Sequence, residues 1–309
     1  MTTRMSVQAP SSVVMIRPHH FIPNPETAAD NAFQEQSVTD DSAAVAASAY
    51  REVTNAAAAL AEAGITVHLF DDESASSPDS VFPNNWFSTH SGGHVAIYPM
   101  FSPSRRNERR MDVIELLKRD YRVQDVIDYS GLEHDDVFLE GTGAMVLDHV
   151  TRVAYAARSH RADPIALERF CTNFGYEPIA FDAVDGGGTP IYHTNVLMCI
   201  ATDFALVGLD LIPDSRRRDQ VRERLAAPGR EIIELTEAQI RDFAGNAIEL
   251  QGARSRVLAL SRRALDSLTA EQLATIEPYC ELLPLDVSTI ELAGGSVRCM
   301  IAGIHLDPR

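Results

Sequence analysis

A repeat of about 50 residues constrains the fold of this 309-residue chain more than any other feature. Two short apolar strands, a helix and a further strand recur in that order. The hairpins are expected to begin near residues 84, 144, 194, 246 and 296. Repeats of this length are typical of propellers and arrays. We therefore predict one domain of five hairpin–helix–strand units. The alternative is an ordinary α/β sheet, in which each hairpin would be an unexpected antiparallel insertion.

The two ends of the chain are expected to complete the fifth unit. Residues 296–302 supply one strand of a hairpin, but no partner strand follows them. Residues 13–17 read as a buried strand, and residues 40–63 read as an Ala-rich helix that leads to a strand at 65–70. If the first strand pairs with the last, the ring closes and no sheet edge is left free.

Polar side chains occupy the turn that leads into each hairpin. A ring places equivalent turns at one end of its axis, so these side chains should converge in one pocket. The residues concerned are Asn85, Glu140, His193, Asn195, Asn246 and Cys299. Each is ordinary alone, since a Glu before Gly is usually a turn residue and a lone Cys usually a small buried hydrophobe. A Cys, a His and a Glu at equivalent places of one repeat indicate a functional site.

Cys299 follows two glycines and precedes an apolar run, Met300-Ile301. We expect it at the mouth of a strand, partly exposed on a rigid element, as a nucleophile requires. The alternative is that this thiol is simply a buried core group.

Composition narrows the functional classes. The formal net charge of −17 disfavours a nucleic-acid partner, because phosphate binding depends on Lys and Arg. No apolar run reaches the roughly 18 residues that a membrane span needs, and the N-terminus lacks the features of a signal peptide. The four cysteines form no CxxC pair and no zinc spacing. We therefore expect free thiols in a cytoplasmic protein, with no membrane partner and no metal.

The motifs resemble those of the pentein, or guanidine-modifying, superfamily, and most closely its amidinotransferase and arginine-deiminase-like branch. Glu140, the isolated His193 and the near-terminal Cys299 occur in the order typical of this superfamily. The segments RPHHF (17–21) and NPET (24–27) resemble the citrulline-utilisation hydrolase group within it. The resemblance covers nearly the whole chain.

This resemblance implies a single pentein catalytic domain over residues 1–309, folded as a five-bladed α/β propeller. It also implies covalent catalysis. Cys299 would attack the central carbon of a guanidino or ureido group, and His193 would protonate the departing amine and then activate water. Glu140 would bind the substrate nitrogens or orient His193. The resemblance implies no cofactor and a small amino-acid substrate, and it leaves a homo-oligomer open.

Two positions depart from the pattern of arginine deiminases, which carry Asp where this chain has Asn85 and Asn195. A bound cation would lose two charge-assisted hydrogen bonds, each of roughly 1.5–3 kcal/mol. The sequence therefore favours a neutral ureido substrate, citrulline, giving ornithine, carbon dioxide and ammonia. Phe82 is a further candidate for substrate binding. Arg17 would bind the substrate carboxylate or form a structural salt bridge.

Two other functions remain open from the sequence. The first keeps arginine as the substrate, through deimination or amidino transfer. The second is a non-catalytic pentein that binds a partner, as ribosome-associated members do. The presence of Cys299, His193 and Glu140 together, and the acidic charge, argue against the second.

Overall fold

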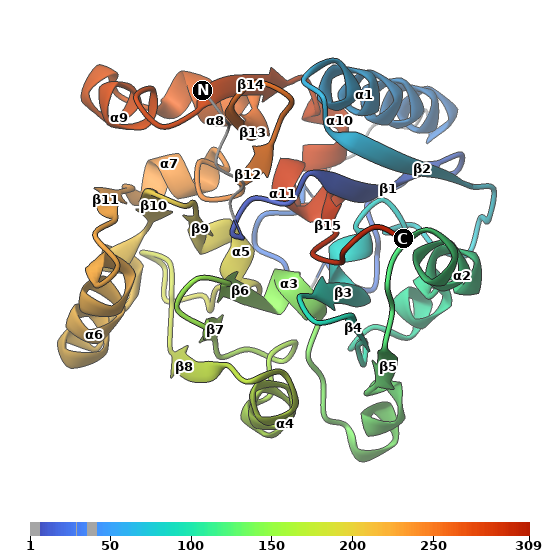
Figure 1. Ribbon diagram of the computed structural model, residues 1–309, viewed down its shortest axis with the longest axis horizontal. Coiled ribbons are helices and arrows are strands. Elements are labelled where there is room, and N and C mark those ends of the chain that lie inside the picture. Colours follow the sequence, from blue (N-terminus) through green and yellow to red (C-terminus); the bar gives the residue numbers. More distant parts are fainter. Residues whose placement is uncertain (1–6, 29, 36–41) are drawn as a thin grey trace.

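The described part of the chain, residues 7–28, 30–35 and 42–309 of a computed structural model, contains five three-stranded sheets. In each sheet the middle strand pairs antiparallel with one neighbour and parallel with the other. The predicted repeat of hairpin and parallel strand is therefore confirmed. Figure 1 shows the sheets arranged around the centre of the molecule, with the longer helices at the periphery.

The strands of each sheet follow in spatial order. They are β3 Phe87–His90, β4 His94–Ile97 and β5 Asp125–Asp128; β6 Met145–Asp148, β7 Val153–Ala157 and β8 Glu177–Phe181; β9 Met198–Ile200, β10 Phe204–Val207 and β11 Glu231–Glu234; β12 Ile248–Gln251, β13 Arg256–Ser261 and β14 Glu281–Leu285; β15 Ala302–Gly303, β1 Ser12–Pro18 and β2 Thr66–Asp72.

The fifth sheet joins the two ends of the chain, as predicted. β1 pairs antiparallel with β15 through Val13–Gly303 and Val14–Ala302, and it pairs in parallel with all of β2. Because β1 is buried between these partners, its side chains reach the core and the strand reads as a nearly continuous apolar run.

The outer helices follow from amphipathic patterns and recognisable ends. Helix α1 (Ser42–Glu62) buries Val45, Ala49, Val53 and Leu60 on one face; residues 40 and 41 of the predicted helix lie outside the described part. The other helices of two turns or more are α2 Met111–Asp120, α4 Pro164–Phe174, α6 Ser215–Ala226 and α9 Ala270–Ile276. Short helices that the sequence did not predict are α7 Glu237–Arg241, α8 Arg262–Ser267 and α10 Ser288–Glu291.

The sequence pattern predicts one helix over residues 105–119, but this segment is divided in the structure. A 3-10 segment, η2 (Pro103–Glu108), is separated from α2 by the extended residues Arg109 and Arg110. The break allows the guanidinium of Arg105 to point inward, whereas a continuous surface helix would keep most of its charges in water.

The predicted strand at 296–302 is wrong over most of its length. Val297–Met300 forms a single helical turn, α11, and only Ala302 and Gly303 pair as a strand. The side chain of Asn246 caps this turn, because its Oδ1 accepts hydrogen bonds from the backbone N–H groups of Ser296 (3.1 Å) and Cys299 (3.4 Å).

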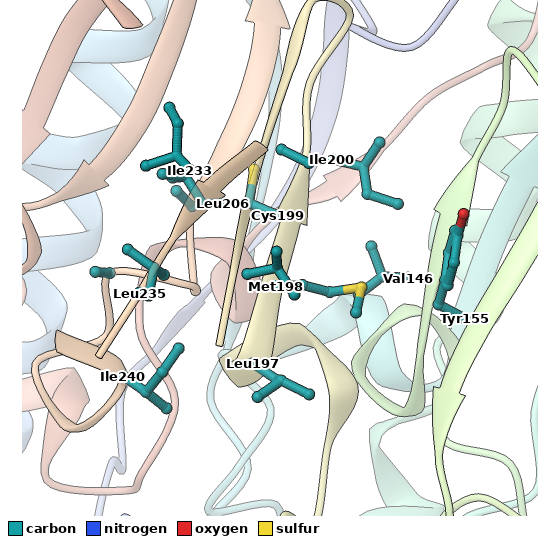
Figure 2. Packing of buried hydrophobic residues seen from close by; sticks show 14 of the residues in the cluster. Val146, Tyr155, Leu197, Met198, Cys199, Ile200, Leu206, Ile233, Leu235 and Ile240 are labelled. Atoms are coloured by element: carbon teal, nitrogen blue, oxygen red, sulfur yellow. The ribbon is translucent and has the colours of Figure 1, made fainter. Parts of the chain in front are cut away.

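Apolar side chains fill the space between neighbouring sheets. Figure 2 shows Met198 and Ile200 of β9 facing Val146 of β6, while Cys199 lies among residues of β10 and β11. This packing fixes the inner ends of the sheets. None of the described helices is long and apolar enough to cross a membrane.

Candidate active site

Most of the candidate site residues lie on, or directly before, single helical turns that each precede an inner strand. These turns are η1 Pro83–Asn85, α3 Gly141–Ala144, α5 Thr194–Leu197 and α11. Glu140 and His193 are the N-cap residues of α3 and α5, Asn195 lies within α5, and Cys299 lies within α11. The sequence located the turns correctly but gave no indication that they are helical.

Two glycines let these turns approach one another closely. A Cβ on Gly143 would clash with the side-chain amide of Asn85 and would lie 2.9 Å from His193 Nδ1. A Cβ on Gly295 would lie 2.9 Å from the Phe82 ring and 3.1 Å from the Cys299 Cβ. Any other residue at either position would push these side chains apart.

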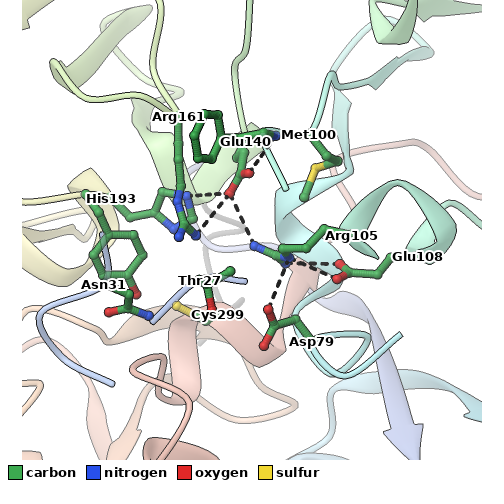
Figure 3. A network of polar contacts seen from close by, with 12 residues as sticks. Thr27, Asn31, Asp79, Met100, Arg105, Glu108, Glu140, Arg161, His193 and Cys299 are labelled. Atoms are coloured by element: carbon green, nitrogen blue, oxygen red, sulfur yellow. Dashed lines mark hydrogen bonds and ion pairs between the residues drawn. The ribbon is translucent and has the colours of Figure 1, made fainter. Parts of the chain in front are cut away.

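Glu140 is the centre of a buried polar network (Figure 3). Its Oε2 lies 2.9 Å from His193 Nε2, 3.2 Å from Arg105 Nη1 and 3.6 Å from Arg161 Nη1. Its Oε1 accepts a hydrogen bond from the backbone N–H of Phe101. Burial alone would raise the pKa of Glu140, but the Arg161 and Arg105 guanidiniums outweigh it and hold this pKa well below its ordinary value. Glu140 is therefore ionised.

His193 is neutral at physiological pH. Burial lowers its pKa to about 4, and the neighbouring Glu140 carboxylate only partly opposes this. With Glu140 as acceptor, the ring proton belongs on Nε2, and Nδ1 is left with a lone pair. The side of the ring that faces Asn85 and Gly143 can therefore accept a proton.

The thiol of Cys299 is buried, at 2% exposure, so the predicted partial exposure is wrong. The amide Nδ2 atoms of Asn195 and Asn246 each lie 3.2 Å from its Sγ. Burial raises the thiol pKa, while the hydrogen bonds from these amides and the charge of Arg298 oppose the rise. The resting thiol is therefore protonated, but donors already surround the position where a thiolate would form.

Asn195 also presents an unused acceptor. Its Oδ1 is buried and has no hydrogen-bond partner among the described residues. A buried polar atom without a partner is costly, so this oxygen is expected to accept a hydrogen bond from a water or from an N–H group of a ligand. It belongs to the same amide whose nitrogen contacts the thiol, so such a donor would sit beside Cys299.

Asn85 faces a cation instead of an open pocket. When its amide oxygen is directed at Arg105, it accepts from Nη2 (2.9 Å) and Nη1 (3.2 Å), and its nitrogen donates to Asn84 Oδ1. Phe82, at 4% exposure, lies beside Gly295 and Cys299. Both residues therefore belong to the same cluster as Glu140 and His193.

Arg17 is the one predicted site residue placed elsewhere. Its guanidinium forms a two-pronged salt bridge with Asp71 (2.8 and 3.0 Å) and covers the ring of Tyr50. Asp71 is exposed on β2, so this pair lies at the surface, away from the Glu140 network.

Two buried arginines belong to the site, and the sequence analysis did not identify them. Arg105 binds Glu108 through both arms (2.9 and 3.0 Å) and lies 3.6 Å from Asp79. Arg161 binds Asp30 through both arms (3.0 and 2.6 Å) and lies over the ring of Tyr192. A run such as Arg105-Arg106 reads equally well as a solvated helix start, so no sequence signal separated these arginines from surface charges.

The site has more carboxylates than arginines. Asp79, Glu108 and Glu140 are all buried around Arg105 and Arg161, and Asp30 adds a fourth carboxylate at the edge. Burial raises the pKa of Asp79, and the charge of Glu140 adds to this rise. A bound cation would relieve this excess of negative charge. The described residues contain no group of three or more His, Cys, Asp or Glu positioned to hold a metal ion.

The fold matches several solved structures at low sequence identity. One is the substrate-bound N-terminal domain of ArgZ, an arginine dihydrolase of the ornithine-ammonia cycle in cyanobacteria, with a TM-score of 0.74, 16% identity and coverage of 95% of this chain and 97% of that one. Unliganded AgrE matches with a TM-score of 0.75 at 17% identity, over 96% of this chain but 40% of AgrE.

A third match is a dimethylarginine dimethylaminohydrolase variant in an adduct with S-methyl-L-thiocitrulline. Its TM-score is 0.63 at 14% identity, with coverage of 95% of this chain and 99% of that one. The sequence search of curated proteins gave no match.

Fold and sequence together define the class of protein. The chain is a member of the pentein superfamily, as its sequence motifs indicated. Residues 17–306 match the family described as "N,N dimethylarginine dimethylhydrolase, eukaryotic", and the chain belongs to this family.

Proposed function

We propose that this protein is a hydrolase that cleaves a C–N bond in the guanidino group of arginine or an N-substituted arginine. The observation that supports this most is the arrangement around Cys299. Two amides donate to its sulfur, and the unpaired Oδ1 of Asn195 can accept an N–H from a guanidino group. His193, two residues before Asn195, supplies a neutral base held by Glu140.

The proposed reaction proceeds through a covalent S-alkylthiouronium intermediate on Cys299. Cys299 Sγ attacks the guanidino carbon as its proton passes to His193 Nδ1, and His193 then gives this proton to the departing amine. The C–N bond breaks and an S-alkylthiouronium remains on the sulfur. His193 next takes a proton from water, the water oxygen attacks the same carbon, the C–S bond breaks, and His193 returns the proton to the sulfur. The products are the amine, a ureido amino acid and the regenerated thiol.

The charge balance of the site favours a cationic substrate. Asp30, Asp79, Glu108 and Glu140 outnumber Arg105 and Arg161 by two when all are ionised. Burial raises the pKa of Glu108 to about 8, and a bound guanidinium would favour the ionised form of these carboxylates. Glu140 remains the partner of His193, which leaves Asp79 as the carboxylate available to the substrate nitrogens.

Arg161 is the proposed ligand for the substrate carboxylate. Its side chain is 2% exposed and its two arms hold the Asp30 carboxylate, in the two-pronged geometry that an α-carboxylate would also use. A substrate carboxylate would exchange with Asp30 at this position. Arg17 forms a surface salt bridge, so it takes no part in this proposal.

Citrulline is the second candidate substrate. Asn85 and Asn195 carry no charge at positions where arginine deiminases carry Asp, and an amide nitrogen can donate to a ureido oxygen. The relatives of similar fold are named for arginine or dimethylarginine, which supports the first candidate instead.

We also propose that residues 1–309 form one catalytic domain, a closed five-bladed propeller with the active site at one end of its axis. The pairing of β1 with β15 supports closure. The four cysteines are free and buried, in keeping with a cytoplasmic location.

A substrate panel tests the proposal. The purified protein would be incubated with L-arginine, dimethyl-L-arginine, L-citrulline and agmatine, and the products identified by mass spectrometry. We expect consumption of arginine or dimethylarginine by the wild type and none by Cys299→Ser. Turnover of citrulline alone would favour the second candidate. Turnover of no substrate, or full activity of Cys299→Ser, would contradict both.

A further inference from the structure

A small polar cavity of about 50 Å³ is lined by residues outside the Glu140 network. The lining includes side chains from both ends of the chain and from the inner strands, among them Gln8, Thr89, His149, Arg298 and His305. Arg298 directly precedes Cys299 in α11, so this cavity and the thiol share one helical turn.

Arg298 is a cation without a counter-ion among the described residues. Its Nη1 donates to the carbonyl of Ile301 at 2.9 Å, and no described carboxylate forms a salt bridge with it. Burial lowers its pKa, and no carboxylate charge opposes this change. The buried arginines Arg105, Arg161 and Arg230 each bind a carboxylate through both arms. Arg298 is half-buried, and a guanidinium held partly away from water without a carboxylate partner still has a cost that an anion would reduce.

Two stacked histidines face the same cavity. The rings of His149 and His305 lie with their centroids 3.9 Å apart. His149 Nδ1 is bonded to the hydroxyl of Tyr176 at 2.9 Å, and His305 bonds the backbone of Val7. Burial and the charge of Arg298 lower the pKa of both histidines, that of His305 to about 4. Both rings are therefore neutral, and Arg298 is the cation among the described lining residues.

The one carboxylate in the described lining is already engaged. Glu249 Oε2 accepts from the backbone N–H and the hydroxyl of Thr202, at 2.8 and 2.6 Å. Its Oε1 forms an ion pair with Arg256 Nη1 at 3.2 Å, without a hydrogen bond among the described residues. Glu249 is therefore committed to these partners, and Arg298 keeps donors that can serve a ligand.

We propose that this cavity binds a small monovalent inorganic anion of the size of chloride or bicarbonate, held mainly by Arg298. The size of the proposed ion follows from the volume of the cavity, because a cavity needs roughly 10–15 Å³ to hold one water. About 50 Å³ therefore holds a few waters or one such ion, but no amino acid.

The anion site is coupled to the thiol. The charge of Arg298 lowers the pKa of Cys299, and a bound anion would offset that charge. Anion binding is therefore expected to slow alkylation of Cys299 at a fixed pH below the thiol pKa. By linkage, formation of the Cys299 thiolate should weaken binding of the anion by the same factor.

Bromide is the probe for the test, because its anomalous X-ray scattering identifies it. Crystals of the wild type soaked in bromide should show an anomalous peak beside Arg298, and Arg298→Met should lose it. Arg262→Met, which removes an exposed arginine from α8, should keep it. Bicarbonate added with bromide should reduce the peak, whereas glutamate, too large for the cavity, should leave it.

A solution measurement accompanies the crystals. At matched ionic strength, bromide should raise the Tm of the wild type and slow Cys299 alkylation at least twofold, relative to glutamate salts. Arg298→Lys, which keeps the charge, should retain part of both effects. It serves as the test variant if Arg298→Met folds poorly. Bromide found only at the surface, or equal effects of bromide and glutamate salts, would overturn the proposal. None of these readouts depends on turnover, so they stand apart from the proposed reaction.

Discussion

The Oε2 atom of Glu140 lies 2.9 Å from the Nε2 atom of His193, and the same oxygen also lies 3.2 Å from Arg105 Nη1. One carboxylate oxygen therefore orients the ring that we propose as the general base, and it also balances a buried arginine. This double role makes Glu140 a structural residue as well as a residue of the reaction.

Glu140→Gln is expected to destabilise the protein strongly. It breaks the buried ion pairs of Glu140 with Arg105 and Arg161, and removing one partner of a buried pair typically costs about 3–5 kcal/mol. Urea unfolding should therefore show a clear drop in the free energy of unfolding. Glu115→Gln, on the exposed face of α2, is the matched control and should change it by less than about 0.5 kcal/mol. Equal stability of the two variants would contradict the network as described.

Asn195→Asp is expected to suppress the reactivity of the thiol. The change removes a donor 3.2 Å from Cys299 Sγ and puts a negative charge beside it, which should raise the thiol pKa by roughly 1–3 units. Iodoacetamide labelling of the Cys299 peptide, followed by mass spectrometry across pH, should slow at least tenfold near pH 8. Asn173→Asp, where the amide bonds Tyr129 instead, should label at the wild-type rate. Unchanged labelling of the Asn195 variant would argue against the amide–thiol contact.

The contact between Asn195 and Cys299 also changes the interpretation of the two asparagines, Asn85 and Asn195. From the sequence alone, these are two positions where arginine deiminases carry Asp and this chain does not. That comparison predicts that replacing both by Asp would restore arginine binding. In the structure Asn195 donates to the thiol and Asn85 contacts Arg105, so the double variant would alter the nucleophile and a buried arginine as well. Kinetics of that variant alone therefore cannot decide the substrate.

Stability is expected to fall as the pH drops from about 6.5 to about 4. Burial lowers the pKa of His193 to about 4, whereas the unfolded chain titrates near 6.5, so in this window the unfolded state binds more protons. Each histidine of this kind lowers the free energy of unfolding by about 1.4 kcal/mol per pH unit in this window. His193→Gln should reduce the slope of the unfolding free energy against pH, and the exposed His134→Gln should not. Parallel slopes for both variants and the wild type would contradict a neutral buried His193.

Much of the architecture could be predicted because it is local. The alternation of short apolar strands and amphipathic helices predicted the repeat, and the pairing of residues 13–17 with the C-terminus followed from counting strands. The helical form of α3, α5 and α11 could not be predicted, since four-residue turns have no periodicity of their own. They depend on tertiary partners, as α11 depends on Asn246.

The site could be predicted only in its polar core. Glu140, His193, Asn195 and Cys299 stand at equivalent places of a repeat, which is visible in the sequence. Arg161 could not be found in this way, because its role depends on a contact with Asp30, 131 residues away. The surface placement of Arg17 likewise depends on its distant partner Asp71.

Arg161→Gln is expected to raise KM for arginine much more than for agmatine, which has no carboxylate. Loss of a two-pronged charge-assisted bond of about 1.5–3 kcal/mol corresponds to roughly a 10-fold to 150-fold change in kcat/KM for arginine. Steady-state kinetics with both compounds would measure it. Arg158→Gln, an exposed arginine nearby in the sequence, serves as the control. An equal loss for both substrates would show that Arg161 serves structure instead of the substrate carboxylate.

The central claim is that Cys299 forms a covalent bond with the guanidino carbon. Rapid acid quenching of the wild type during turnover of arginine, followed by peptide mass spectrometry, tests it directly. We predict that the peptide with Cys299 carries the S-alkylthiouronium adduct during turnover and loses it when arginine is exhausted. The peptides with Cys171, Cys199 and Cys280 should stay unmodified, because burial raises the pKa of each of these thiols to about 12. Product formation from arginine with Cys299 unmodified at every time point would contradict the account.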